Sequence, residues 1–259
     1  MYPYIFVLGI QIPTYGICLA MAFVVVTLGS ILRAKKKKIV PEDILIVAAS
    51  VLGCAICGAK ILYIMVSYTW YEIITFIRMG NCEFLLGDGL VFAGGLLCGL
   101  LGAVIGAKIA GTKLYHLENA IVPLLPIGYA IGRIGCFFAG CCYGMIYAGP
   151  GAVHYKNSLL GLSPDVGYFP VQLVDALINV CVTIRLLYSA KKDRKHYELL
   201  VEYLSLYAVS RFFLEYLRGD YHRGIYGIFS TSQWICIILL LVCIVWKVCR
   251  KNKNPKPAL

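Results

Sequence analysis

Charged residues are scarce in this chain. Of its 259 residues, 14% are charged and 60% are hydrophobic. The apolar share exceeds the roughly one half that is usual in soluble domains, and the uncharged runs are long enough to cross a bilayer. This shortage of charge excludes an ordinary soluble domain and indicates a polytopic membrane protein.

The sequence also lacks the spacing of a zinc site and the basic start of a cleavable signal peptide. Twelve cysteines are present, but no second CxxC accompanies the one at Cys54 and Cys57, and no Cys/His ligand pattern occurs. Most cysteines stand singly in apolar runs, where cysteine behaves as a small hydrophobe. No lysine or arginine precedes the first apolar run, so we expect that run to remain as an anchor.

Seven apolar stretches are long enough to cross a bilayer as helices, since about 20 residues are needed. The sixth is the least apolar and requires protein or water around its polar face. The expected fold is an all-α polytopic membrane protein with one membrane domain over residues 1–259, ending in a basic cytoplasmic tail at 250–259. The predicted spans are residues 12–32, 43–66, 89–111, 117–140, 169–189, 197–218 and 231–249.

Lysine and arginine are unevenly shared between the predicted loops. If the spans alternate, sixteen fall on one side, in residues 33–38, 108–113, 191–195 and 247–256, and four fall on the other. This asymmetry predicts an N-terminus outside and a C-terminus in the cytoplasm. The basic runs are short and adjoin spans, so they favour orientation and attraction to anionic lipids over nucleic-acid binding, despite the net charge of +11.

Glycines in the third and fourth spans are spaced for close helix packing. Small residues three or four positions apart allow two helix backbones to approach each other. The pattern predicts packing and implies no function. The glycines concerned are Gly95, Gly99, Gly102 and Gly106 in the third span, and Gly128 and Gly132 in the fourth.

The sixth span carries polar residues on one helical face. Tyr207, Arg211, Glu215 and Arg218 follow one another at steps of four, four and three residues. At 100° per residue they fall within an arc of about 80°. Glu215 can pair with Arg211 at the i,i+4 spacing. Glu215 neutralises only one of the two arginines on this face. The positive charge of the other therefore remains available for an anionic ligand.

Polar side chains also interrupt the fourth and fifth spans. Arg133 is an isolated charge in the fourth, and Gln172, Asp175 and Asn179 share a face of the fifth. The predicted topology places these residues toward the outer half of the membrane. Arginine binds phosphate oxygens in bidentate fashion, so a cavity faced by Arg133 and Arg211 predicts a phospholipid head group as ligand. A second interpretation stays open, in which these groups only satisfy one another between helices.

Several segments resemble, in the same order, the motifs of the prolipoprotein diacylglyceryl transferase family. GRIGCFFAGCCYG at 132–144 resembles the signature GRxGNFxNGExxG, and YAVSRFFLEYLR at 207–218 is similar to YxxxRFxxExxR. The resemblance runs from about residue 10 to 245, with seven spans as in the family. Further matches are TYGICLAMAF with the first-span YG motif, GAKILY at 58–63 with GARxxY, DGLVFAGG at 88–95 with GMSFHGG, FPVQLVDA with HPSQLYEA, and Gln233 with a glutamine that opens the last span.

The resemblance implies a transferase in the bacterial cytoplasmic membrane. Such an enzyme moves the diacylglyceryl group of phosphatidylglycerol to the lipobox cysteine thiol of a prolipoprotein, forming a thioether at the outer face. This is the first step of lipoprotein maturation. The partners implied are phosphatidylglycerol, the lipobox of the prolipoprotein signal peptide and membrane lipids, with no nucleic acid and with no metal or organic cofactor.

The resemblance also implies roles for individual residues. Arg133 and Arg211 would hold the phosphate, and Tyr207 would assist activation of the thiol. Glu215 and Arg218 would orient Arg211 or admit substrate. The substrate-binding residues implied are Tyr15, Lys60, Gly94, Gly95, Gln172, Asp175 and Arg218.

The chain departs from the family pattern at several polar positions. Ala93 stands where the family has a histidine, so a mechanism that depends on that histidine cannot operate here. The other departures are Lys60 for arginine, Cys136 and Ala139 for asparagines, Cys141 for an acidic residue, Phe169 for histidine and Asp175 for glutamate.

These departures leave two other interpretations open. In one, the protein binds or translocates phospholipid through the same arginine cavity and performs no thioether chemistry. In the other, Cys136, Cys141 and Cys142 form a thiol redox site or a metal site at the outer face.

Overall fold

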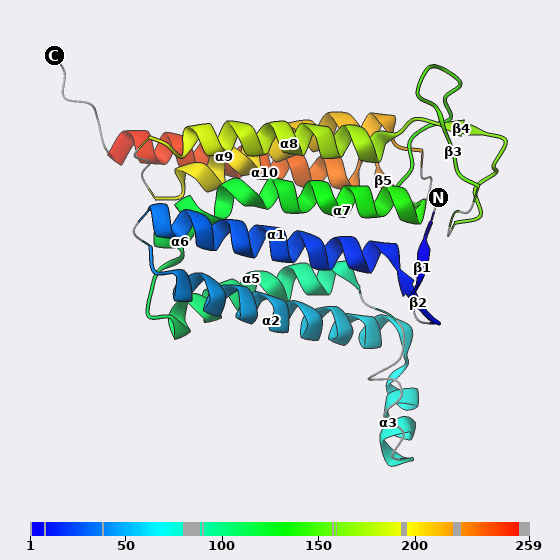
Figure 1. Ribbon diagram of the computed structural model, residues 1–259, viewed down its shortest axis with the longest axis horizontal. Coiled ribbons are helices and arrows are strands. Elements are labelled where there is room, and N and C mark those ends of the chain that lie inside the picture. Colours follow the sequence, from blue (N-terminus) through cyan, green and yellow to red (C-terminus); the bar gives the residue numbers. More distant parts are fainter. Residues whose placement is uncertain are drawn as a thin grey trace. The chain divides into compact units, whose positions relative to one another are not determined.

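The computed structural model describes residues 2–7, 9–37, 39–79, 89, 91–156, 158, 160–192, 196–219 and 224–253. These residues are mostly helical and include three two-stranded antiparallel hairpins (Figure 1). They divide into two compact units, Met1–Gly29 with Glu118–Leu259, and Ser30–Leu117. Parts of three predicted features lie outside the described residues: 80–88 and 90, which include the start of the DGLVFAGG segment, 193–195 in the basic loop, and 254–259 in the basic tail.

The elements follow one another along the chain in this order: β1 (Tyr4–Val7), β2 (Ile10–Pro13), α1 (Thr14–Lys36), α2 (Pro41–Ser67), α3 (Trp70–Arg78), α5 (Phe92–Ile109), α6 (Leu114–Ile121), η1 (Val122–Leu124), α7 (Leu125–Ala139), β3 (Val153–His154), β4 (Gly167–Tyr168), α8 (Val171–Ser189), α9 (Glu198–Leu214), η2 (Glu215–Leu217), β5 (Ile225–Tyr226), β6 (Phe229–Ser230) and α10 (Thr231–Lys253).

Among the described residues, five helical segments are long and apolar enough to cross a membrane. The protein is therefore a multi-pass membrane protein. The other two predicted spans contain the shorter helices α5 and α9. α5 is apolar, whereas α9 carries both apolar and polar residues. The five are Thr14–Lys36, Pro41–Ser67, Leu114–Ala139, Val171–Ser189 and Thr231–Lys251.

The fourth predicted span, 117–140, is not one continuous α-helix. α6 ends at Ile121, the 3-10 turn η1 covers Val122–Leu124, and α7 begins at Leu125. Pro123 and Pro126 explain the change, because proline has no backbone N–H to donate and its ring crowds the preceding turn. Both prolines fall in the first turn of the element that they open, where an N–H would lack a helical partner anyway.

The sixth predicted span ends earlier than expected. α9 stops at Leu214, η2 follows, and Arg218 has extended backbone angles. The prediction that Arg218 shares a helical face with Tyr207 is therefore wrong. The physical reason is backbone pairing with the loop after α7, since Gly219 N donates to Tyr143 O at 3.0 Å and Arg218 bridges Gly144.

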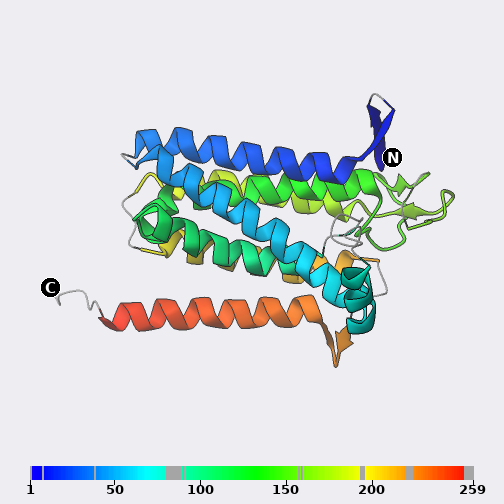
Figure 2. The ribbon, with the colours of Figure 1, turned by 90° about the horizontal axis from the view of Figure 1, so that it is seen from below.

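The second unit is built on the packing of α2 against α5, which both views show side by side (Figures 1 and 2). A Cβ atom on Gly102 would lie 2.5 Å from Ser50 O, and one on Gly106 would lie 2.8 Å from Val47 Cα. Gly58 and Gly94 face each other in the same way. The predicted glycine packing is confirmed at Gly102 and Gly106, where only a hydrogen side chain fits.

The first unit packs α7 against α8, α8 against α9 and α9 against α10. The first part of α1 lies on α7, because a Cβ atom on Gly128 would lie 2.7 Å from Val26 Cγ2 and one on Gly135 would lie 2.8 Å from Cys18 Cβ. Glycine packing is thus confirmed at Gly128. It is wrong at Gly132, where an added Cβ would meet nothing within 4 Å among the described atoms.

A carboxylate from α6 fixes the start of α9. Glu118 Oε2 accepts a hydrogen bond from Tyr197 N at 2.5 Å, and its Oε1 accepts one from Leu200 N at 2.9 Å. The first N–H groups of a helix have no partner within the helix and carry partial positive charge. Glu118 therefore satisfies two backbone donors and holds α9 to α6 in a largely apolar region.

We expect a methyl group at Gly58 to disrupt the α2–α5 contact. Gly58→Ala would place Cβ against Cys98 and the backbone of Gly94, and it should lower the free energy of unfolding by about 1–3 kcal/mol. Gly53→Ala is the matched control, because a Cβ there meets nothing within 4 Å and alanine is the better helix former. Unfolding in mixed micelles titrated with dodecyl sulfate measures both variants, and equal stability would contradict the packing assignment.

Candidate functional site

One face of α8 carries buried polar side chains. Gln172, Asp175 and Asn179 are exposed by 0%, 2% and 1%, so the predicted shared face is confirmed. Asn179 Nδ2 donates to Asp175 Oδ1 at 2.9 Å and to its backbone oxygen at 2.8 Å. Asn179 is therefore satisfied within its own helix, where it holds the Asp175 carboxylate in place.

Asp175 reaches across to α7 and binds Arg133. Arg133 Nε lies 2.8 Å from Asp175 Oδ2, and the two side chains are exposed by 8% and 3%. The Tyr129 hydroxyl donates to the same carboxylate oxygen at 3.2 Å, and the Arg133 guanidinium lies 5.9 Å from the centre of the Tyr129 ring. Tyr129 was not among the predicted site residues, although its place four residues before Arg133 puts both on one helical face.

A second buried ion pair lies at the end of α9. Arg211 Nη2 is 2.8 Å from Glu215 Oε2, as the i,i+4 spacing predicted. Arg218 Nη1 lies 3.9 Å from the same oxygen, so Arg218 stays near Glu215 although it has left the helix. Glu215 is 4% exposed and therefore carries its charge almost without water.

The start of α10 orients Glu215. The Ser230 hydroxyl donates to Glu215 Oε1 at 3.0 Å. Ser230 and Gln233 form a capping box, since Ser230 N donates to Gln233 Oε1 at 3.0 Å and Gln233 N donates to Ser230 Oγ at 3.2 Å. Gln233, which resembles the glutamine that opens the last span in the family, thus acts on Glu215 through Ser230. The SxxQ spacing was the signal that could have found Ser230.

Two tyrosines lie between the ion pairs. The Tyr129 and Tyr207 ring centroids are 5.6 Å apart in an edge-to-face arrangement, and both Arg133 and Arg211 act electrostatically on the Tyr129 hydroxyl. Within the described part of the chain, Arg133 Nη2 and Arg211 Nη1 are buried and have no hydrogen-bond partner. The cluster therefore retains donors for an anion.

The loop after α7 folds back onto the helix end. Gly140 has φ of +70° and ends α7, and Cys141 N donates to Cys136 O at 3.1 Å. This is the hydrogen bond of a Schellman motif, which requires the left-handed conformation that glycine adopts most easily. Gln172 Nε2 donates to Cys141 O at 2.9 Å and to the Tyr155 hydroxyl at 3.0 Å. Gln172 thus ties this loop to α8.

Three cysteine thiols meet at this turn. The Sγ atoms of Cys136, Cys141 and Cys142 all lie within 4.8 Å of one another. Hydrogen bonding to the other two thiols, together with the positive charges of Arg218 and Arg133, lowers the pKa of Cys142 from its ordinary value. Tyr15, near the start of α1, lies close enough to act electrostatically on all three thiols and on Arg133.

The structure brings most of the predicted site residues into the first unit. Lys60, Gly94 and Gly95 belong to the second unit. There Gly94 packs against Gly58, and a Cβ on Gly95 would lie 3.3 Å from Ala55 O, so packing accounts for both glycines. Lys60 Nζ lies 5.0 Å from the centre of the Tyr63 ring. The residues that cluster in the first unit are Tyr15, Arg133, Gln172, Asp175, Tyr207, Arg211, Glu215 and Arg218.

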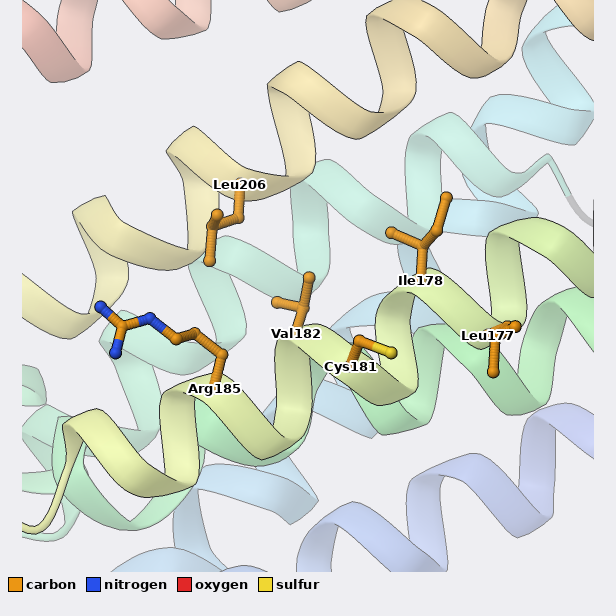
Figure 3. Close-up of a pocket in the computed structure, with 6 residues that line it drawn as sticks. All are labelled: Leu177, Ile178, Cys181, Val182, Arg185 and Leu206. Atoms are coloured by element: carbon orange, nitrogen blue, oxygen red, sulfur yellow. The ribbon is translucent and has the colours of Figure 1, made fainter.

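An apolar groove of about 360 Å³ lies between α8 and α9 (Figure 3). At 100° per residue its α8 residues are centred about 120° around the helix from the buried polar face. The groove is therefore separate from the arginine cluster, by which we mean Arg133, Arg211 and Arg218 with their carboxylate partners Asp175 and Glu215. It is lined by Leu177, Ile178, Cys181, Val182, Arg185 and Leu206.

Comparison with known proteins decides the family. Residues 3–249 match the family described as prolipoprotein diacylglyceryl transferase. This chain belongs to that family.

Relatives match over nearly the whole length of both chains. A phosphatidylglycerol–prolipoprotein diacylglyceryl transferase 2 of Clostridium perfringens is 28% identical, covering 96% of this chain and 95% of the relative. Phosphatidylglycerol–prolipoprotein diacylglyceryl transferases of Clostridium tetani and Clostridioides difficile are each 30% identical, covering 95% of this chain and 96% and 94% of the relatives. The resemblance seen in the sequence motifs is thus confirmed.

Family membership gives the arginine cluster a context. The two segments with the strongest motif resemblance to prolipoprotein diacylglyceryl transferases, 132–144 and 207–218, supply both buried guanidiniums. Their backbones also pair directly, because Gly144 and Arg218 form an antiparallel β-bridge. The motifs are therefore neighbours in space within the first unit.

We expect Asp175→Ala to destabilise the protein strongly. The substitution leaves the buried Arg133 charge without a counter-ion, which costs about 3–5 kcal/mol in comparable buried pairs. Arg185→Ala on the same helix is the control, because Arg185 is 56% exposed in its pair with Glu202 and should cost less than about 1 kcal/mol. Detergent unfolding distinguishes them, and a small loss for both would show that Arg133 has another counter-ion.

Proposed function

We propose that this protein transfers the diacylglyceryl group of phosphatidylglycerol to the lipobox cysteine thiol of prolipoproteins. The names of its relatives identify phosphatidylglycerol and prolipoprotein as their substrates. The observation that carries the proposal is the pair of buried guanidinium nitrogens, Arg133 Nη2 and Arg211 Nη1, that have no hydrogen-bond partner among the described residues. A lipid phosphate supplies the acceptor oxygens that these donors require.

Charge balance supports an anionic ligand. The cluster contains three arginines, Arg133, Arg211 and Arg218, against two carboxylates, Asp175 and Glu215. One positive charge remains in excess at a buried place. A bound phosphate diester compensates that charge, which explains why the ion pairs alone do not complete the site.

The proposed reaction places negative charge on the phosphate. The acceptor sulfur forms a bond to the glyceryl carbon, the bond from that carbon to the phosphate oxygen breaks, and glycerol phosphate leaves with the electron pair. Arg133 and Arg211 stabilise this developing charge, which is the largest single contribution in many enzymes. Asp175 and Glu215 hold the two guanidiniums in position, and Tyr207 is the residue that we propose to assist loss of the thiol proton.

Substrate binding is assigned to the remaining predicted residues. Tyr15, Gln172 and Arg218 lie around the arginine cluster and the loop after α7. Lys60, Gly94 and Gly95 are proposed from the motif resemblance. A lipid-binding or lipid-translocating protein without transfer chemistry would use the same arginines, but the family and its named relatives favour the transferase.

We further propose that the protein lies in the bacterial cytoplasmic membrane, with seven spans and the active site toward the outer face. The distribution of lysine and arginine supports an N-terminus outside and a C-terminus in the cytoplasm. The basic residues in the last turns of α1 and α5, Arg33, Lys35, Lys36 and Lys108, fall on the side expected to be cytoplasmic.

Arg133→Lys and Arg211→Lys test the proposed phosphate site. Lysine keeps the charge but offers a single point of contact, so each variant should lose about 10²–10³ in kcat/KM. Transfer from phosphatidylglycerol to a fluorescent lipobox peptide measures the rate, with Arg185→Lys as a control of unchanged activity. The unmodified gene should also restore lipoprotein modification in cells depleted of their own transferase, and no rescue despite normal membrane levels would refute the function.

The proposed orientation predicts the location of the C-terminus. A fluorescent protein fused after Leu259 should fluoresce, because it stays in the cytoplasm, whereas alkaline phosphatase fused at the same position should be inactive. Active phosphatase there would place the C-terminus outside and reverse the topology. Insertion of the same phosphatase in the loop between α7 and α8 is the control, and this fusion should be active.

A further inference from the structure

The three thiols at the end of α7 are a feature that the arginine cluster does not explain. By the motif resemblance, Cys136 and Cys141 stand where the family has an asparagine and an acidic residue. The structure places these thiols and that of Cys142 within 4.8 Å of one another. Cys136 is 9% exposed and the other two are half-buried. No disulfide joins any of the described cysteines.

The spacing of the three sulfur atoms fits a metal ion. With metal–sulfur bonds of about 2.3 Å, two thiolates on one zinc ion lie about 3.8 Å apart. Separations within 4.8 Å therefore close onto an ion with side-chain adjustments of well under 1 Å each. Three sulfur ligands select a soft or borderline ion such as zinc over magnesium or calcium.

The backbone holds the thiols in this arrangement. Cys142 has φ of +53°, a left-handed conformation that costs a residue with a side chain about 1 kcal/mol or more. Hydrogen bonds fix the turn on both sides, from Gln172 Nε2 to Cys141 O at 2.9 Å and from Gly219 N to Tyr143 O at 3.0 Å. Strain that the surrounding structure maintains is typical of functional sites.

Two arginine side chains lie near the thiols. Arg133 and Arg218 both act electrostatically on Cys142, and Arg133 also acts on Cys136. A zinc ion with three thiolates carries one negative charge in total. This charge is opposite in sign to the guanidiniums of Arg133 and Arg218, which would therefore attract the bound ion.

The cluster also leaves a coordination position open. Zinc in a catalytic site has three protein ligands and a fourth position for water or substrate. Within the described part of the chain, no further side chain that could serve as a fourth ligand, whether histidine, cysteine or carboxylate, joins the three thiols. We propose that Cys136, Cys141 and Cys142 bind a zinc ion whose fourth position receives the thiol of the acceptor peptide. This inference rests on the proposed function for the identity of that acceptor.

Zinc coordination would activate the acceptor thiol. Zinc would lower the pKa of the coordinated acceptor thiol, so that the proton whose loss Tyr207 assists would pass to water and the sulfur would remain bound as a thiolate. The thiolate sulfur then donates its electron pair to the glyceryl carbon, and the carbon–oxygen bond to the phosphate breaks. The leaving phosphate keeps that electron pair and is held by Arg133 and Arg211. No oxidant or reductant is required, and zinc keeps its charge.

Metal content tests the site without reference to activity. We would dialyse the purified protein against zinc chloride and then against zinc-free buffer. Inductively coupled plasma mass spectrometry should then find one zinc ion per chain. The variant Cys136→Ser/Cys141→Ser/Cys142→Ser should retain none. Cys57→Ser/Cys181→Ser/Cys249→Ser, which removes three exposed cysteines, is the matched control and should retain one. No zinc in the unmodified protein, or one zinc in the cluster variant, would overturn the proposal.

Cobalt substitution tests the open position and needs no variant. Cobalt(II) bound to the unmodified protein should show sulfur-to-metal charge-transfer absorption. A lipobox peptide with its cysteine should change this spectrum, because a further thiolate enters the fourth position, and the same peptide with serine should not. An unchanged spectrum with the cysteine peptide would overturn the assignment of the fourth position.

Activity separates this inference from the proposed function. Protein treated with a zinc chelator should transfer at least tenfold more slowly, and added zinc should restore the rate. Full transfer by zinc-free protein would overturn the inference and leave the proposed function intact. Absence of transfer by zinc-loaded protein would refute the proposed function, while zinc content and the cobalt spectrum would still decide the metal site.

Discussion

The burial of two arginines in an apolar helix bundle is the constraint on which the first unit depends. A guanidinium that leaves water needs a counter-ion and hydrogen-bond acceptors, or the helix that carries it is not stable in the membrane. Asp175 from α8 is the counter-ion of Arg133 in α7, and Glu215 from η2 is the counter-ion of Arg211 in α9. The packing of these helices therefore follows from charge compensation as much as from apolar contact.

A further feature of the first unit is that α7 and α9 both end next to the buried ion pairs. Gly140 ends α7, and the 3-10 turn η2 ends α9. The released segments then pair with each other, through Met145 N to Leu217 O and Gly219 N to Tyr143 O. Continuous helices would have carried Cys141 and Arg218 away from the buried ion pairs. Early termination instead keeps the thiols and a third arginine near the guanidiniums that we propose to bind phosphate.

The sequence predicted those features that depend on local spacing. The Arg211–Glu215 pair and the polar face of α8 follow from positions three or four residues apart on one helix, so they could be found without a structure. The hydrogen bonds of Tyr129 to Asp175 and of Ser230 to Glu215 join separate elements, and no pattern within one helix specifies them. The ends of α6 and α9 were missed because apolar periodicity continues through the turns η1 and η2.

The structure supports a different interpretation of the three cysteines at the end of α7 from the one that their sequence positions suggest. Singly, each of Cys136, Cys141 and Cys142 is a small apolar side chain, and the sequence offers no ligand spacing. In the structure their sulfur atoms converge to within 4.8 Å of one another, and Arg133 and Arg218 lie near Cys142. This chain has Ala93 at the position of the family's histidine, so it needs another way to remove the proton of an acceptor thiol. A zinc ion held by these three thiolates, as we propose, would supply that function, since coordination would make the acceptor thiol more acidic.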